Sequence, residues 1–244
     1  YAHPEMPKPQ ITMMPEQVIE RQPLVTAEQF TVTNDYVQLQ VEFPLKVISS
    51  AVHNAGMGWY SNFLNRSISP DYNIEDVKEE TVQFLVERDF SLTNTVVMLT
   101  AVEANLVAIR SFNHERFSIT VAVTAGVGNA VDVTRTYERQ EAAYIGTINT
   151  WVIVNGKLSD EAFYQAMITA TEAKTKALAE EDIRDVQTNT IATGTATDSL
   201  LIAATQHGEE MPYAGPITDV GKLIGHGVFE TTVEAIRKYK QSKN

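Results

Sequence analysis

Residues 117–129 read Phe-Ser-Ile-Thr-Val-Ala-Val-Thr-Ala-Gly-Val-Gly-Asn, and this stretch decides the fold class. Its first eight residues are rich in β-branched side chains, which favour a strand, and the glycines that follow end it. Between residues 30 and 43, two period-two apolar runs are separated by Thr33-Asn34-Asp35. Because Asn and Asp favour turns, this pattern predicts a β-hairpin.

Strands follow one another along the chain more often than they alternate with helices. The second strand of the hairpin continues through residues 45–50, and further strands are predicted at residues 96–104, 144–154 and 188–204, the last interrupted by Gly194. Helical spacing of apolar residues predicts three helices, at residues 74–89, 159–180 and 219–239. Ser159 is the expected N-cap of the second helix. We therefore predict a single α+β domain, a mixed and largely antiparallel sheet covered by about three helices. The domain spans residues 27–244, and residues 1–26 form a Pro-rich N-terminal extension.

The composition excludes several classes of protein. With 19 Lys and Arg against 31 Asp and Glu in 244 residues, the net charge is −12, so we expect no nucleic-acid partner. No apolar run approaches the roughly 18 residues of a membrane span. The chain has no cysteine, which excludes disulfides and a thiol nucleophile. Its start lacks the pattern of a signal peptide, so we predict a cytoplasmic location.

Familiar catalytic motifs are also missing. The sequence holds no His-Glu-x-x-His helix, no Gly-x-Ser-x-Gly elbow, no Walker A loop and no Gly-x-Gly-x-x-Gly turn. Four other segments are richer in small and polar residues than folding requires. They lie at or near strand ends, where Gly allows a ligand to approach and Asn or Thr supplies polar atoms. They are residues 49–56, 124–130, 146–150 and 193–199.

These segments, in this order, resemble the adenosylcobinamide amidohydrolase family (CbiZ type). The matching pieces are Met98-Leu99-Thr100-Ala101-Val102, residues 124–130, Gly146-Thr147-Ile148-Asn149, Thr171-Glu172-Ala173-Lys174-Thr175, residues 192–199, Tyr213-Ala214-Gly215 and the Gly-spaced last helix. The resemblance covers about residues 45–236. One departure is Asn54-Ala55-Gly56, where the family usually has Asn-Gly-Gly. We expect this loop to survive, unless position 55 needs a positive φ.

The resemblance implies a function. Members of the family cleave the amide that joins a corrinoid side chain to aminopropanol, so that adenosylcobinamide gives adenosylcobyric acid for cobalamin salvage. The cobalt-containing corrinoid is then a small-molecule substrate. The sequence identifies no cofactor, and participation of a divalent metal stays open, because Asp, Glu and His can converge from distant segments. A homo-oligomer, and a fusion to or cooperation with corrinoid uptake proteins, are further hypotheses.

Amide hydrolysis needs a base, an acid for the leaving amine and donors for the oxyanion. Asp198 is our first choice for base or water positioner, with a turn-capping Asp as the alternative. Lys174 lies on the small, apolar stripe of its helix, so it acts as acid or base, pairs with Asp198 or extends to solvent. His53 is a candidate proton shuttle, and Thr195 is a nucleophile only if a base lies close to it.

Five further residues are candidates for substrate binding. Asn54 and Asn129 suit amide recognition or hydrogen bonding to the oxyanion, although Asn is also common in simple turns. The other three candidates are Gly126, Thr147 and Glu172. We predict that these loops converge into one pocket. Two rival hypotheses stay open: an inactive corrinoid-binding or carrier domain, and a nucleotide- or phosphate-binding enzyme. The second is weakened because none of the four loops contains Lys or Arg.

Overall fold

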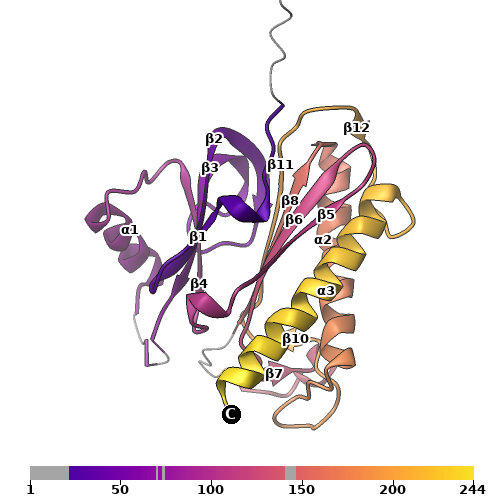
Figure 1. The fold of residues 1–244 in the computed structure, drawn as a ribbon. Coiled ribbons are helices and arrows are strands. Elements are labelled where there is room, and N and C mark those ends of the chain that lie inside the picture. The colour runs from indigo at the N-terminus through magenta and orange to yellow at the C-terminus, as the bar shows by residue number, and fades with distance from the viewer. Residues whose placement is uncertain (1–21, 70, 73–74, 141–146) are drawn as a thin grey trace, which may run out of the picture.

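The computed structural model describes residues 22–69, 71–72, 75–140 and 147–244, and they fold around one curved sheet (Figure 1). In the described residues this sheet has eight strands, in the order β4-β3-β2-β11-β8-β6-β5, with β1 paired to β2. The strands are β1 (Phe30–Val32), β2 (Tyr36–Ser49), β3 (Gly56–Ser67), β4 (Thr95–Thr100), β5 (Ala108–Asn113), β6 (Ser118–Ala125), β8 (Ile148–Asn155) and β11 (Ser199–Ala204). Two two-stranded sheets flank it, pairing β7 (Ala130–Val131) with β10 (Gly194–Thr195) and β9 (Lys157–Leu158) with β12 (Glu210–Met211).

The predicted fold class is confirmed. Only β3·β4 and β8·β11 are parallel neighbours in the large sheet, and its other pairs are antiparallel. The predicted hairpin is β1 and β2, joined at Thr33-Asn34-Asp35. Residues 188–204 are not one strand, since only β10 and β11 are extended there, and residues 144–146 of another prediction lie outside the described residues.

Sequence reasoning missed β3 and β5. The buried residues of β3 form one block, 62–65, instead of alternating, and most residues of β5 are only half-buried or exposed. Neither strand therefore has a period-two signal.

The three helices are α1 (Val77–Glu87), α2 (Asp160–Glu180) and α3 (Asp219–Ser242). Figure 1 shows α2 and α3 lying side by side against the sheet. They bury Phe163, Ala166, Ile224 and Val228 against one face of β6, β8 and β11. Ser159 caps α2 as predicted, because its Oγ accepts a hydrogen bond from the amide of Ala162 at 3.1 Å. The shorter α1 packs Phe84 and Leu85 on β3 and β4.

The sheet curls until β4 lies over β8, although three strands separate them in the sheet order. The indole Nε1 of Trp151 on β8 donates to the sulfur of Met98 on β4 at 3.1 Å, and the rings of Trp151 and Phe63 are 6.3 Å apart. This curl encloses a second apolar core on the face away from α2 and α3. It also brings the end of β4 next to the start of β8.

The pairing register brings several predicted loops together at one end of the strands, where β2 and β6 end and β8 and β11 begin. Asn149, second residue of β8, pairs with Thr124 at the end of β6 and with Ser199 at the start of β11. The end of β2 lies there too, since Ser49 pairs with Leu201. Asp198 is the residue just before β11, so it lies at this end as well.

The predicted N-terminal extension is partly described. Residues 1–21 lie outside the described residues. Val25 is buried, and its amide and carbonyl both bond to the side chain of Asn155. The end of the predicted extension is therefore packed against the sheet. No helix among the described residues is long and apolar enough to cross a membrane.

Candidate active site

Asp198 is the centre of a dense set of hydrogen bonds. Its Oδ2 accepts from Lys174 Nζ at 2.6 Å and from the amide of Thr195 at 3.1 Å. Its Oδ1 accepts from Thr195 Oγ1 at 2.5 Å and from the amide of Ile148 at 3.0 Å. The side chains of Lys174 and Asp198 are only 14% and 19% exposed, so the ion pair is largely shielded from solvent. Four donors from three segments fix the carboxylate in one orientation.

Gly194 makes this arrangement possible. A Cβ at position 194 would lie 2.3 Å from Asp198 Oδ2 and 2.8 Å from Lys174 Nζ. Both separations are shorter than van der Waals contact, so any side chain would displace the ion pair. The glycine is required here because its backbone approaches the pair closely.

Three of the four predicted loops meet around this pair. Thr147 Oγ1 donates to the carbonyl of Thr197 at 2.5 Å, and the amide of Gly126 donates to the carbonyl of Thr147 at 3.0 Å. Ala130, which follows Asn129, pairs with Thr195 across the β7–β10 ribbon. Residues 124–130, 147–150 and 193–199 are therefore neighbours in space, as predicted. Gly146 lies outside the described residues.

The remaining predicted loop reaches the site through a residue that sequence reasoning did not select. Ser50 Oγ lies 3.0 Å from Ser199 Oγ and accepts from the amide of Leu200. Asn54 Nδ2 instead donates to the carbonyls of Leu92 and Thr95, and His53 Nε2 bonds to the same Leu92 carbonyl at 2.8 Å.

The side chains of His53 and Asn54 thus form hydrogen bonds with the backbone at the start of β4 and not with Asp198 or Lys174. Asn54 and Gly56 have positive φ, but Ala55 does not, so the departure from Asn-Gly-Gly leaves the backbone unstrained, as expected.

Glu172 is exposed on α2, two residues from Lys174. Two residues correspond to about 200° around a helix, so its side chain leaves the helix on a different side from Lys174. No contact in the described residues joins Glu172 to the pair. Its predicted binding role gains no support from this geometry.

A buried carboxylate anchors the loop that follows β7. Asp185 accepts from Arg139 Nη2 at 2.5 Å and from the amides of Asp132, Gln187 and Thr188. Burial by itself would raise the pKa of Asp185, but these hydrogen bonds outweigh it and hold the pKa well below the ordinary value. The pKa of Asp132 is also lowered, first by its hydrogen bonds with Thr134 and Thr190. Both groups tie residues 130–139 to residues 185–190, beside the β7–β10 ribbon.

The curl of the sheet adds a polar chain that the sequence analysis overlooked. Asn149 Nδ2 donates to Asn65 Oδ1 at 2.7 Å and to the carbonyl of Leu99 at 2.9 Å. Asn65 Nδ2 in turn donates to Thr124 Oγ1 at 2.8 Å. Asn65 carried no sequence signal, because it lies in the unrecognised strand β3. Asn149 and Thr124 lie inside segments that the sequence did single out.

The pair has the parts that acid–base chemistry on an amide needs. Asp198 is a fixed carboxylate within hydrogen-bonding distance of a hydroxyl, Thr195, which is the condition set above for a threonine nucleophile. The amino group of Lys174, a residue type able to give or take a proton, lies 2.6 Å from Asp198 Oδ2. Within the described ranges no three His, Asp or Glu side chains are grouped so that they could hold a metal ion.

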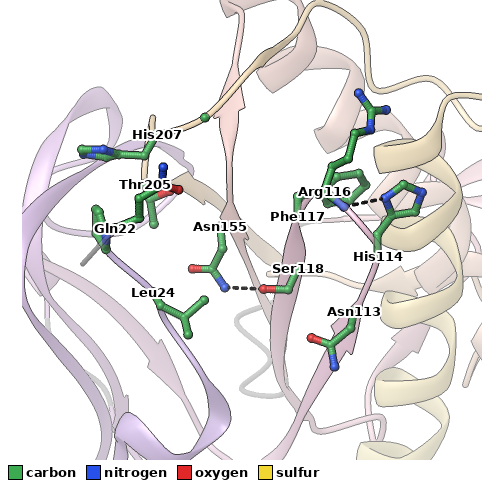
Figure 2. A pocket seen from close by; sticks show the side chains of 12 residues that line it. Gln22, Leu24, Asn113, His114, Arg116, Phe117, Ser118, Asn155, Thr205 and His207 are labelled. Atoms are coloured by element: carbon green, nitrogen blue, oxygen red, sulfur yellow. Dashed lines mark hydrogen bonds between the residues drawn. The ribbon is translucent and has the colours of Figure 1, made fainter. Parts of the chain in front are cut away.

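A cavity of about 410 Å³ opens at the opposite end of these strands, where β6 begins and β8 and β11 end. Figure 2 shows its polar lining, with Asn155 Nδ2 donating to Ser118 Oγ at 2.8 Å and Thr205 nearby. Thr205 follows Ser199 by six strand residues, which corresponds to about 20 Å. None of the predicted site residues lines this cavity.

The sequence is similar to proteins of one family over most of its length. A model of the adenosylcobinamide amidohydrolase family matches residues 21–244. The adenosylcobinamide amidohydrolase of Methanosarcina mazei is 30% identical over 181 residues, which cover 72% of this chain and 83% of that protein.

Two other relatives match over a smaller share of their own length. An uncharacterized protein of Methanocaldococcus jannaschii is 38% identical over 100 residues, covering 41% of this chain and 39% of that protein. An uncharacterized ABC transporter ATP-binding protein of Bacillus subtilis is 25% identical over 205 residues, covering 84% of this chain and 38% of that protein. The matched regions thus span less than two fifths of the length of these two relatives.

Among solved structures, the PH0078 protein from Pyrococcus horikoshii OT3 gives a TM-score of 0.45 at 10% identity. The match covers 89% of this chain and 81% of that one.

Proposed function

The chain belongs to the adenosylcobinamide amidohydrolase family, and we propose that it hydrolyses the amide between a corrinoid side chain and aminopropanol. The products of this reaction are adenosylcobyric acid and the free amine. We further propose that it acts in the cytoplasm, in corrinoid salvage. The observation that carries the proposal is the shielded Asp198–Lys174 pair, with the Thr195 hydroxyl 2.5 Å from the carboxylate.

In the proposed reaction the amide C–N bond breaks and water is added across it. Asp198 accepts the proton of the attacking hydroxyl, which belongs to water or to Thr195. The acyl carbon gains that oxygen, and the nitrogen leaves as an amine after receiving a proton from Lys174. If Thr195 attacks, a water molecule then hydrolyses the acyl ester and regenerates the hydroxyl. Because the amide of Gly126 already donates to the carbonyl of Thr147, the backbone amide of Gly128 is the candidate donor to the oxyanion.

The test is incubation of the purified protein with adenosylcobinamide, with adenosylcobyric acid detected by mass spectrometry. Lys174→Met should lower kcat by at least about 100-fold, the ordinary contribution of a general acid or base. Lys176→Met is the matched control, because Lys176 is exposed on the same helix and should leave kcat unchanged.

Two further variants identify the nucleophile. If Thr195 attacks, Thr195→Ser should retain turnover and Thr195→Val should abolish it, whereas a water nucleophile leaves both variants active. Tight corrinoid binding without any turnover by the wild type would favour the carrier domain. Binding of nucleotides in place of corrinoids would favour the phosphate-binding enzyme.

A further inference from the structure

Asn149 has a buried carbonyl oxygen for which the described residues supply no donor. The residue is only 1% exposed, and its Oδ1 has no hydrogen-bond partner. An unpaired polar atom at such a position costs about 1–3 kcal/mol, so it needs an explanation.

The orientation of the Asn149 amide is fixed by its neighbours. Its Nδ2 donates to Asn65 Oδ1 and to the carbonyl of Leu99, and both partners are acceptors. Rotating the amide by 180° would place Oδ1 against these two oxygens and lose both hydrogen bonds. The unpaired atom is therefore the carbonyl oxygen, and it can only accept.

The position of Asn149 connects this acceptor to the Asp198 pair. The preceding residue, Ile148, donates its amide to Asp198 Oδ1 at 3.0 Å. Ser199, which follows Asp198, is the register partner of Asn149, so their side chains project from the same face of the sheet, the one that carries the enclosed apolar core and not α2. Ser199 is half-buried and hydrogen bonds with the exposed Ser50. Solvent therefore reaches within about one strand spacing, 4.8 Å, of Asn149.

We propose that Asn149 is a substrate-binding residue whose Oδ1 accepts a hydrogen bond from the N–H of the scissile amide. This inference rests on the proposed function, in which the substrate is a secondary amide and carries one such N–H. The bond distinguishes an amide from the corresponding ester, which has no donor at that atom. Asn149 thereby adds selectivity to a site in which Asp198 activates the attacking hydroxyl.

The test compares the amide substrate with its ester counterpart, in which oxygen replaces the N–H. The quantity measured is the ratio of kcat/KM for amide to kcat/KM for ester. Asn149→Ala should lower this ratio about tenfold, the effect of one net hydrogen bond. Asn65→Ala is the matched control for the polar chain, because it removes a hydrogen-bond partner of Asn149 but keeps Asn149 Oδ1. The amide-to-ester ratio of this variant should equal that of the wild type. Thr150→Val, which removes a neighbouring buried and unpaired hydroxyl, should also leave the ratio unchanged.

The outcomes separate the two proposals. An unchanged ratio in active Asn149→Ala, or an equal fall in Asn65→Ala, would overturn the role of Asn149 and leave the hydrolase intact. A wild type that hydrolyses neither compound would overturn the proposed function itself. If Asn149→Ala does not fold, Asn149→Ser replaces it, because a serine hydroxyl can still donate within the network. The same fall in the ratio is expected of that variant.

Discussion

Gly194→Ala tests whether the geometry of the Asp198–Lys174 pair produces the activity, because it alters no ionisable group. The new methyl carbon would lie 2.3 Å from Asp198 Oδ2, whereas ordinary contact begins near 3.4 Å. The carboxylate must therefore move by about 1 Å, away from four donors that hold it at 2.5 to 3.1 Å. A displacement of this size at a reacting group lowers turnover by about 100-fold.

The same methyl group should also destabilise the fold. Forcing an atom into a filled space costs about 1–3 kcal/mol. For a domain of this size each kcal/mol lowers Tm by about 2–4 °C, so a loss of about 2 kcal/mol lowers it by about 4–8 °C. Calorimetry and the turnover assay with adenosylcobinamide measure the two effects. Gly215→Ala is the matched control, since its Cβ would meet nothing within 4 Å. A Gly194→Ala protein with the Tm and kcat of the wild type would refute the reasoning.

Two further predictions concern acid stability and fluorescence. The pKa of Asp185 is depressed in the folded protein, so its stabilising effect is present above the unfolded pKa, about 3.9, and is lost as the pH falls below that value. The free energy of unfolding, measured with denaturant between pH 3 and pH 7, should thus fall steeply toward pH 3, and Asp185→Asn should make this fall shallower. An equally steep fall in the variant would contradict this assignment. Of the two tryptophans, Trp59 is 54% exposed and Trp151 is 2% exposed. Trp59→Phe should therefore shift the emission to shorter wavelength and remove most iodide quenching, whereas persistent quenching would place Trp151 in contact with solvent.

Local pattern was sufficient where an element carries its own periodic signal. The β-branched run 117–124, the capped helix that begins after Ser159 and the hairpin turn at residues 33–35 were all predictable, because each depends on residues close in sequence. Strand β3 was not predictable. Its buried block, residues 62–65, faces both the enclosed core and α1, so burial there does not alternate. Its hydrogen-bonding partners in β2 and β4, not its own sequence, make it a strand.

The sequence by itself determined the chemistry available at the site: an acidic chain without cysteine, four loops of small and polar residues, and a lysine on the apolar stripe of a helix. Tertiary structure alone decided which of these groups meet. The strand registers bring Asp198 and Thr147 together and α2 adds Lys174, while the backbone of Leu92 and Thr95 engages His53 and Asn54. The curl of the sheet then places Asn65 against Asn149, 84 positions apart in the chain. Such contacts depend on the path of the whole sheet, so no local pattern encodes them.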